Sequence, residues 1–221
     1  MKLTAAQIEE LYAFTRKKYV EYYDVQTELV DHLATSIEEK MSTSSVNFET
    51  ALQQVYTQFG IFGFSDLVGQ KEMEVALKGR NLFRKSFVEY FKLPKILLLL
   101  MIFLVSYKAF QITSFASVIY SFYALIVIFN IILISKIILI KRSIKLPLLQ
   151  FKNIYILSSS VGSYLLMLQI FFNLSFSDLA NWYPIVLPII FSLITISYLA
   201  EIDVLDKLSN QQRRLYPEAF K

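Results

Sequence analysis

The chain has 221 residues, of which 55% are hydrophobic and only 18% are charged, and it contains no cysteine and one histidine. Soluble domains have an apolar share of about 45–50% and a charged share of about 25%. The composition therefore excludes a disordered chain and argues against a wholly soluble protein. The lack of cysteine excludes disulfides, thiol catalysis and cysteine-ligated metals.

The net charge of +4 is unevenly distributed along the chain. Residues 1–77 hold 12 acidic and 6 basic side chains, whereas residues 78–95 hold six basic side chains and one acidic one, Glu89. We therefore divide the sequence into an acidic cytoplasmic domain (1–77), a basic neck (78–95), an apolar region (96–200) and a polar cytoplasmic tail (201–221). A nucleic-acid-binding protein would carry its positive charge on the folded domain, so no nucleic acid partner is expected.

The first 77 residues have the apolar spacing of a small helical bundle. Thr4 and Gln7 are predicted to form a capping box at the start of the first helix. A second helix is expected at about Asp24–Lys40, and Asn47 is placed to cap a third. Gly60 is predicted to end that helix with a positive φ angle.

Three short motifs indicate a family: E-L-V-D-H-L at Glu28–Leu33, F-E-T-A-L at Phe48–Leu52 and Q-F-G at Gln58–Gly60. Over about residues 5–80 the sequence resembles the HAAS signalling domain and the related prefix domain found ahead of some ABC permease subunits. The resemblance implies a cytoplasmic three-helix domain joined to membrane helices. It also implies a role in regulation, because such domains often accompany PadR-type regulators.

The predicted second helix carries an acidic face, on which we place a protein-binding surface; the alternative is an ordinary solvated face. Its predicted partner-binding residues are Glu28, Asp31, His32, Glu38 and Glu39. Glu28 and His32 have the spacing of half a metal site, but a second pair of ligands is missing, so no metal is expected. His32 changes charge near neutral pH, which makes a pH-dependent loosening of the domain a hypothesis.

The neck interleaves aromatic and basic residues over Leu82–Lys92, which is typical of an amphipathic helix in the lipid headgroup region. Pro94 predicts a bend before the first membrane span; the alternative is one continuous helix. The basic residues expected at the headgroups, from the neck and a later loop, are Lys78, Arg80, Arg84, Lys85, Lys92, Lys95, Lys141, Arg142 and Lys145.

Four apolar stretches approach the roughly 20 residues that a membrane-spanning helix needs. They lie at about Ile96–Ile112, Phe115–Ile140, Ile154–Leu174 and Tyr183–Ala200. The predicted fold is thus all-α, with a small cytoplasmic helical bundle followed by a four-helix transmembrane bundle.

The loops between the apolar stretches predict the orientation. Basic residues gather in the neck and in the loop after the second stretch; near the turn between the first two stretches there is only Lys108, and the loop after the third stretch has none. Because such residues favour the inner side, we expect a multi-pass protein of the bacterial inner membrane with both termini cytoplasmic. Lys136, near the cytoplasmic end of the second stretch, is expected to extend its ammonium group to the headgroups.

The third stretch carries small residues at a helical spacing, which permits close approach of another helix. These predicted packing residues are Ser158, Ser159, Gly162 and Ser163. They would serve packing within the bundle or between protomers of a homo-oligomer.

The sequence has no nucleophile elbow, phosphate loop or dinucleotide fingerprint, so we expect no enzyme, no catalytic residues and no cofactor. The favoured function is a regulatory or adaptor protein whose acidic cytosolic domain contacts another protein, or its own basic neck, while the spans lie in the bilayer. The alternatives are a small-solute channel or transport subunit gated by that domain, or a structural subunit of a membrane assembly.

Overall fold

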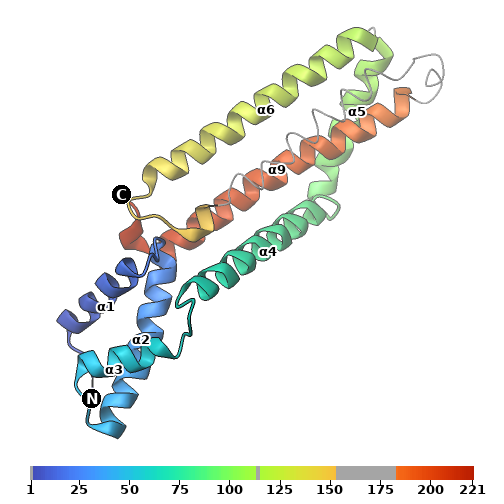
Figure 1. The fold of residues 1–221 in the computed structure, drawn as a ribbon. Helices are drawn as coiled ribbons and strands as arrows, with labels where there is room; N and C mark the ends of the chain where they lie inside the picture. The colour runs from blue at the N-terminus through green and yellow to red at the C-terminus, as the bar shows by residue number, and fades with distance from the viewer. Residues whose placement is uncertain (1, 113–114, 153–182) are drawn as a thin grey trace. The chain divides into compact units, whose positions relative to one another are not determined.

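A computed structural model describes residues 2–112, 115–152 and 183–221 of the chain (Figure 1). The described residues are helical, and the one pairing of extended backbone among them is an isolated bridge between Ile144 and Phe220. The all-α prediction is confirmed for this part of the chain. The helices are α1 (Ala5–Lys17), α2 (Tyr23–Ser44), α3 (Phe48–Thr57), α4 (Ser65–Glu89), α5 (Lys95–Ile112), α6 (Phe115–Ser143) and α9 (Tyr183–Leu215), with 3₁₀ turns η1 (Leu149–Phe151) and η2 (Pro217–Ala219).

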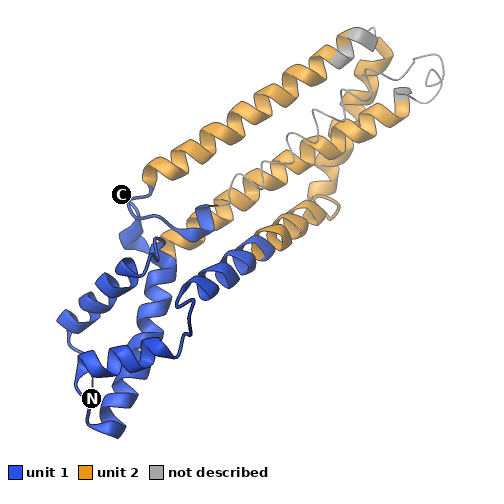
Figure 2. Ribbon diagram, viewed as in Figure 1, with its two compact units in different colours: residues 1–77, 144–152, 215–221 blue, residues 78–143, 153–214 orange. Residues whose placement is uncertain are grey.

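The chain forms two compact units (Figure 2). Unit 1 comprises Met1–Leu77, Ile144–Lys152 and Leu215–Lys221; unit 2 comprises Lys78–Ser143 and Asn153–Arg214. The first boundary falls where the sequence changes from acidic to basic. Unit 1 also includes two segments that lie far from its N-terminal helices in the sequence.

The helix ends of unit 1 follow the predicted capping chemistry. The backbone N–H of Gln7 donates to Thr4 Oγ1 at 3.3 Å, and the N–H of Thr4 donates to Gln7 Oε1 at 2.9 Å. The Asn47 side chain accepts from the N–H of Thr50 at 2.9 Å. These contacts satisfy amide donors that a helix start leaves without partners. Gly60 has the predicted positive φ, at 73°.

The core of unit 1 is built from the apolar faces of α1, α2 and α3. Leu11, Leu33 and Ile37 are completely buried, and Val55 of α3 packs in the same cluster. Leu149, from the segment 144–152, belongs to this cluster and is 1% exposed. The N-terminal helices therefore do not complete their core alone.

The predicted neck helix is the second half of a longer helix, α4, which begins at Ser65. Helix α4 ends at Glu89 and α5 begins at Lys95, with turns between them that include Pro94. The predicted break before the first span is confirmed, and the continuous helix is wrong. A proline in that position favours the break because its ring lacks an amide donor and fixes φ.

Three described helices are long and apolar enough to cross a membrane, over Lys95–Ile112, Tyr120–Ser143 and Ile185–Leu215. They correspond to the first, second and fourth predicted spans. The predicted third span, Ile154–Leu174, and its small residues Ser158, Ser159, Gly162 and Ser163 lie outside the described residues.

Helix α9 extends well beyond the predicted end of its span at Ala200. Val204, Leu205 and Leu208 are at most 1% exposed and continue the buried face of the helix between charged residues. This helical spacing explains why the helix does not stop where the hydropathy falls.

The aromatic side chains of the neck pack inside unit 2. Tyr90 clusters with Ile196 and Ala200 of α9, and Phe83 and Phe87 pack against this cluster. These three aromatic side chains therefore have protein neighbours, and the position of Leu82–Lys92 at the level of the lipid headgroups stays a prediction. Their spacing of three and four residues gives α4 an apolar face toward α9.

Acidic residues of α4 and α9 engage two of the lysines expected at the headgroups. Lys95 Nζ lies 3.0 Å from Asp203 Oδ2 and 3.6 Å from Glu89 Oε2. Lys136 forms an ion pair with Asp206. Both lysines therefore have acidic partners on α9, which continues as a helix far enough to present both aspartates, and their contact with lipid headgroups stays a prediction.

Candidate functional site

The predicted partner-binding residues share one face of α2. Residues three, four and seven positions apart lie on the same side of a helix, which aligns Glu28, Asp31, His32 and Glu39 along α2. Asp31, His32 and Glu39 are exposed to solvent. Among the described residues, neither Asp31 nor Glu39 forms an ion pair.

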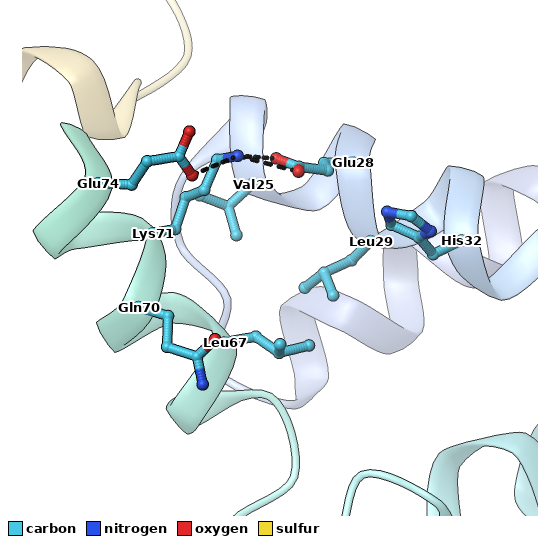
Figure 3. A pocket seen from close by; sticks show the side chains of 8 residues that line it. All are labelled: Val25, Glu28, Leu29, His32, Leu67, Gln70, Lys71 and Glu74. Carbon is cyan, nitrogen blue, oxygen red and sulfur yellow. Dashed lines mark hydrogen bonds and ion pairs between the residues drawn. The ribbon is translucent and has the colours of Figure 1, made fainter. Parts of the chain in front are cut away.

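A cavity of about 220 Å³ opens between α2 and the first half of α4 (Figure 3). Figure 3 shows the apolar side chains of Leu29 and Leu67 between the two helices and the His32 ring farther along α2. The lining residues are Val25, Glu28, Leu29, His32, Leu67, Gln70, Lys71 and Glu74. The structure thus brings two predicted residues, Glu28 and His32, together with a polar edge contributed by α4.

Lys71 joins the two sides of this cavity. Its Nζ lies 2.9 Å from Glu28 Oε2 and 3.1 Å from Glu74 Oε2 (Figure 3). The hydrogen bond to Glu28 raises the pKa of Lys71, despite the opposing effect of partial burial. The charge of Glu28 is therefore largely satisfied within unit 1, which leaves Asp31 and Glu39 as the more available acidic groups.

Glu38 has a structural contact. Its Oε1 accepts a hydrogen bond of 2.8 Å from the backbone N–H of Leu3. The carboxylate holds the segment before α1 against α2, so Glu38 is occupied at the end of the predicted acidic face.

The first turn of α2 binds the segment 144–152. Asp24 Oδ1 accepts from the N–H of Leu149 at 2.9 Å, and Asp24 Oδ2 accepts from the N–H of Gln150 at 3.4 Å. The N–H of Tyr23 donates to the Pro147 carbonyl at 2.8 Å. Burial raises the pKa of Asp24, while the backbone hydrogen bonds oppose that rise. Asp24 acts here as a cap for η1 from a distant part of the chain.

The same turn of α2 contacts the C-terminal segment 215–221. The Tyr23 hydroxyl donates to Glu218 Oε2 at 2.7 Å. Partial burial and this bond raise the pKa of Tyr23 to about 12. The two attached segments also join each other, since the N–H of Lys145 donates to the Ala219 carbonyl at 2.7 Å. We call the contacts of Tyr23 and Asp24 with these segments the α2 clamp.

A second link to the segment 144–152 comes from α4. Lys152 pairs with Glu72, and this hydrogen bond raises the pKa of Lys152. Glu72 lies on α4 one residue from Lys71, which lines the cavity. The two helices that line the cavity, α2 and α4, therefore also hold the segment 144–152, through the α2 clamp and through Glu72.

The remaining basic residues of the predicted headgroup set lie on exposed positions. Lys78, Arg80, Arg84, Lys85 and Lys92 are exposed in unit 2, and so are Lys141 and Arg142 at the end of α6. Lys145 is exposed in unit 1, where its backbone takes part in the bridge to the C-terminal segment.

Within the described part of the chain, no group of three or more His, Asp or Glu side chains could hold a metal ion. Glu28, His32 and Glu74 line the cavity, but the cation Lys71 lies within ion-pair distance of both carboxylates. The hydrogen bonds and ion pairs of the site can recognise charge on a partner, and they offer no evident nucleophile.

Sequence reasoning missed Asp24, Lys71 and Glu218 as parts of the site. Lys71 offered a weak signal, since it is one of only six basic residues within 1–77. The contacts of Asp24 and Glu218 join positions separated by more than a hundred residues, and no local pattern indicates such a pairing.

Comparison of the chain with protein-family models, curated proteins and solved structures finds no match.

Proposed function

We propose that this chain is a regulatory protein of the bacterial cytoplasmic membrane, with four spans and with unit 1 in the cytoplasm. On this proposal unit 1 receives a signal from a cytosolic protein and passes it to the ends of the membrane helices. Three described helices of sufficient length and apolarity support the membrane location.

The three chain segments that form unit 1 support an even number of membrane spans. Residues 1–77, the segment after α6 and the segment after α9 pack into one unit, so they would share one side of a bilayer. Helices α5 and α6 would then cross and return. Because α9 would end on that same side, the chain from 153 to 182 would cross an odd number of times. Its sequence has one apolar stretch of sufficient length, Ile154–Leu174.

The charges support a cytoplasmic location for that side. Lys141 and Arg142 end α6, and Lys145 and Lys152 follow in unit 1. Basic residues in short loops favour the cytoplasmic side of the membrane. The orientation proposed from the sequence therefore agrees with the side on which unit 1 gathers its three segments.

The observation that carries the regulatory role is the α2 clamp. A single helix presents the exposed acidic groups Asp31 and Glu39 and, at its first turn, holds the segments that follow α6 and α9. A partner that shifts α2 would therefore alter contacts at the ends of two membrane helices. Such a coupling needs contacts that differ between two states, and the clamp supplies contacts that a shift of α2 can break.

The exposed acidic face of α2 favours a partner with a basic surface. Asp31 and Glu39 carry negative charge without an ion pair among the described residues, and the Lys71–Glu28 bridge lies beside them. Complementary charge favours encounter and fixes the orientation of a complex. The resemblance to HAAS domains supports the same role for this part of the chain.

Photo-crosslinking in intact cells tests the proposal. A photoreactive benzoylphenylalanine at Thr35, an exposed position on the same face of α2, should capture a cytosolic protein. Combining it with Asp31→Lys and Glu39→Lys should lower the yield by about tenfold or more, because like charges oppose each other across an interface. Glu10→Lys with Glu21→Lys makes the same change of charge elsewhere on unit 1 and should leave the yield unaltered.

Hydrogen exchange then separates a regulator from a passive adaptor. Binding of the captured protein should change the exchange rates of amides in the segments 144–152 and 215–221. Equal loss of crosslinking in both charge-reversal pairs would remove the acidic face from the proposal. Binding without any change in these amides would remove the regulatory coupling.

A further inference from the structure

The basic residues near the start of α5 fall into two groups. Lys95 and Lys207 lie within ion-pair distance of acidic residues, with Glu89 3.6 Å from the first and 3.5 Å from the second. Arg84, Lys85 and Lys92 form no ion pair with any described residue. Two cations of this region therefore pair with acidic residues of unit 2, and three others lie on its surface without an ion pair to any described residue.

These three cations line one shallow cavity of about 450 Å³, together with Val88 and Glu89. Glu89 does not cancel their charge, because its carboxylate is shared by Lys95 and Lys207. The cavity therefore has a net positive charge. Val88 supplies an apolar part of the lining and is 44% exposed, and the residues on either side of Lys92, Phe91 and Leu93, are 44% and 80% exposed.

The opposite face of the same helix fixes the cavity in place. Phe83 and Phe87 pack toward α9, and Ser86, which is buried, accepts a hydrogen bond of 3.1 Å from Lys207 Nζ. Arg84, Lys85 and Val88 consequently point away from α9, since they occupy the other side of α4. The backbone that carries the cations is ordered before any ligand arrives, which lowers the entropic cost of binding.

The position of the cavity relative to α5 indicates its ligand. Helix α5 is apolar enough to span a membrane and begins at Lys95, three residues after Lys92. The residues just before a span lie at the level of the lipid headgroups. Basic side chains at that level attract anionic lipids, each strengthening the interaction about fivefold.

We propose that Arg84, Lys85 and Lys92 form a binding site for the phosphate of an anionic glycerophospholipid, with Val88 and Phe91 against its glycerol and upper acyl chain. A guanidinium and two ammonium groups match a phosphodiester. A zwitterionic lipid would bring its own cationic group against them. The site depends on the membrane location of α5 and is independent of any protein partner of unit 1.

Native mass spectrometry of the full chain in a mild detergent tests the site, with phosphatidylglycerol and phosphatidylcholine as probes. The unaltered protein should retain phosphatidylglycerol in preference. Arg84→Gln, Lys85→Gln and Lys92→Gln together should weaken its retention about 100-fold, three charges at about fivefold each. Retention of both lipids to the same extent by the unaltered protein would overturn the proposal.

A matched control separates the site from the general effect of net charge. Lys2→Gln, Lys17→Gln and Lys221→Gln remove three exposed cations of unit 1 and should leave lipid retention unchanged. Equal losses in the two triple variants would overturn the proposal. A charge-preserving variant, Arg84→Lys with Lys85→Arg and Lys92→Arg, should retain the lipid, which distinguishes lost binding from a failure to fold.

The source of the phosphate is tested by competition. Inorganic phosphate lacks the apolar part of the ligand and should displace little phosphatidylglycerol. Complete displacement by inorganic phosphate would identify a general anion site and overturn the assignment to lipid.

Discussion

Units 1 and 2 are built from the same kind of helix but expose opposite surfaces. In unit 1 the apolar side chains of three helices face one another, and Leu33 and Ile37 are completely buried. In unit 2 only 11% of the Lys95–Ile112 segment is buried, and most of its exposed residues are apolar, with leucine the most frequent. Unit 1 thus covers its apolar side chains, whereas α5 of unit 2 leaves them exposed, as a membrane-spanning helix can in lipid.

The two units also differ in where their polar side chains lie. Unit 2 buries Ser192, Thr195 and Ser197, and each hydroxyl donates to the carbonyl four residues earlier in α9. Asn130 of α6 donates to the Tyr198 hydroxyl at 2.9 Å. These hydroxyl and amide groups thus find partners within the helices, whereas in unit 1 the charged groups remain largely at the surface.

The largest expected effect lies in the core of unit 1. Leu33→Ala should lower its free energy of unfolding by about 2–5 kcal/mol, because a buried cavity forms. Hydrogen exchange of α2 amides in the full chain measures the change. Leu104→Ala removes the same atoms from a side chain of α5 that is 58% exposed and should leave these amides unaffected. Similar exchange in both variants would contradict the contrast between the units.

Replacing an exposed apolar residue by aspartate should cost much more free energy in α5 than in unit 1. Leu104→Asp places a carboxylate near the middle of α5, at a cost to membrane insertion of about 2.5–3.5 kcal/mol. Ile61→Asp alters a side chain of unit 1 that is 99% exposed and should change stability by about 0.5 kcal/mol or less. Alkaline extraction of membranes measures the inserted fraction. Equal insertion of both variants would show that α5 does not meet lipid.

The α2 clamp should contribute less than the core. Asp24→Ala leaves the N–H groups of Leu149 and Gln150 without their acceptor, at a cost of about 1–3 kcal/mol. Faster exchange of these two amides would show the loss. Glu21→Ala, three residues earlier and exposed, is the matched control and should have no effect on them.

The clamp should also make unit 1 dependent on pH. Because burial raises the pKa of Asp24 above 3.8, the folded unit retains a proton that the unfolded chain has released. This contribution to stability is therefore complete below pH 3.8 and is lost as the pH rises through the raised pKa. Asp24→Asn should remove it from the pH profile of unfolding. An unchanged profile would show that Asp24 does not titrate in this way.

The Lys71–Glu28 bridge should have the smallest effect. Exposed ion pairs contribute about 0.2–1 kcal/mol, so Lys71→Met and Glu28→Gln should each destabilise unit 1 only slightly. A double-mutant cycle on chemical unfolding isolates the coupling between the two side chains. A coupling well above that range would indicate that the pair is shielded from water. The description of the charged groups of unit 1 as surface groups would then not hold for this pair.

Local chemistry made much of the fold predictable. Thr4, Asn47 and Gly60 act at the helix ends where their side chains or backbone freedom suggested, and hydropathy located α5, α6 and α9. These features depend on residues close in sequence. The length of α9 was underestimated because hydropathy falls after Ala200, although Val204 and Leu208 continue the helical spacing.

The site was only partly predictable because its contacts are distant in sequence. Glu28 and His32 were identified from one helix face, but their neighbour Lys71 lies on another helix. Composition likewise placed Lys95 and Lys136 near the headgroups but could not indicate their partners Asp203 and Asp206 on α9. The charge pattern of a sequence identifies side chains that need a partner of opposite charge. The identity of a protein partner follows only from the three-dimensional structure.

Helix α9 has 33 residues, and at 1.5 Å per residue it is about 50 Å long, against a hydrocarbon layer of about 30 Å. As a membrane span, α9 would therefore have a section outside the lipid, and Pro188 lies close to its N-terminal end. Helices in a thinner bilayer tilt further to keep their apolar length covered. Because α9 is one continuous helix, such a tilt would displace its aqueous end sideways. The position of that end would then depend on the thickness of the bilayer.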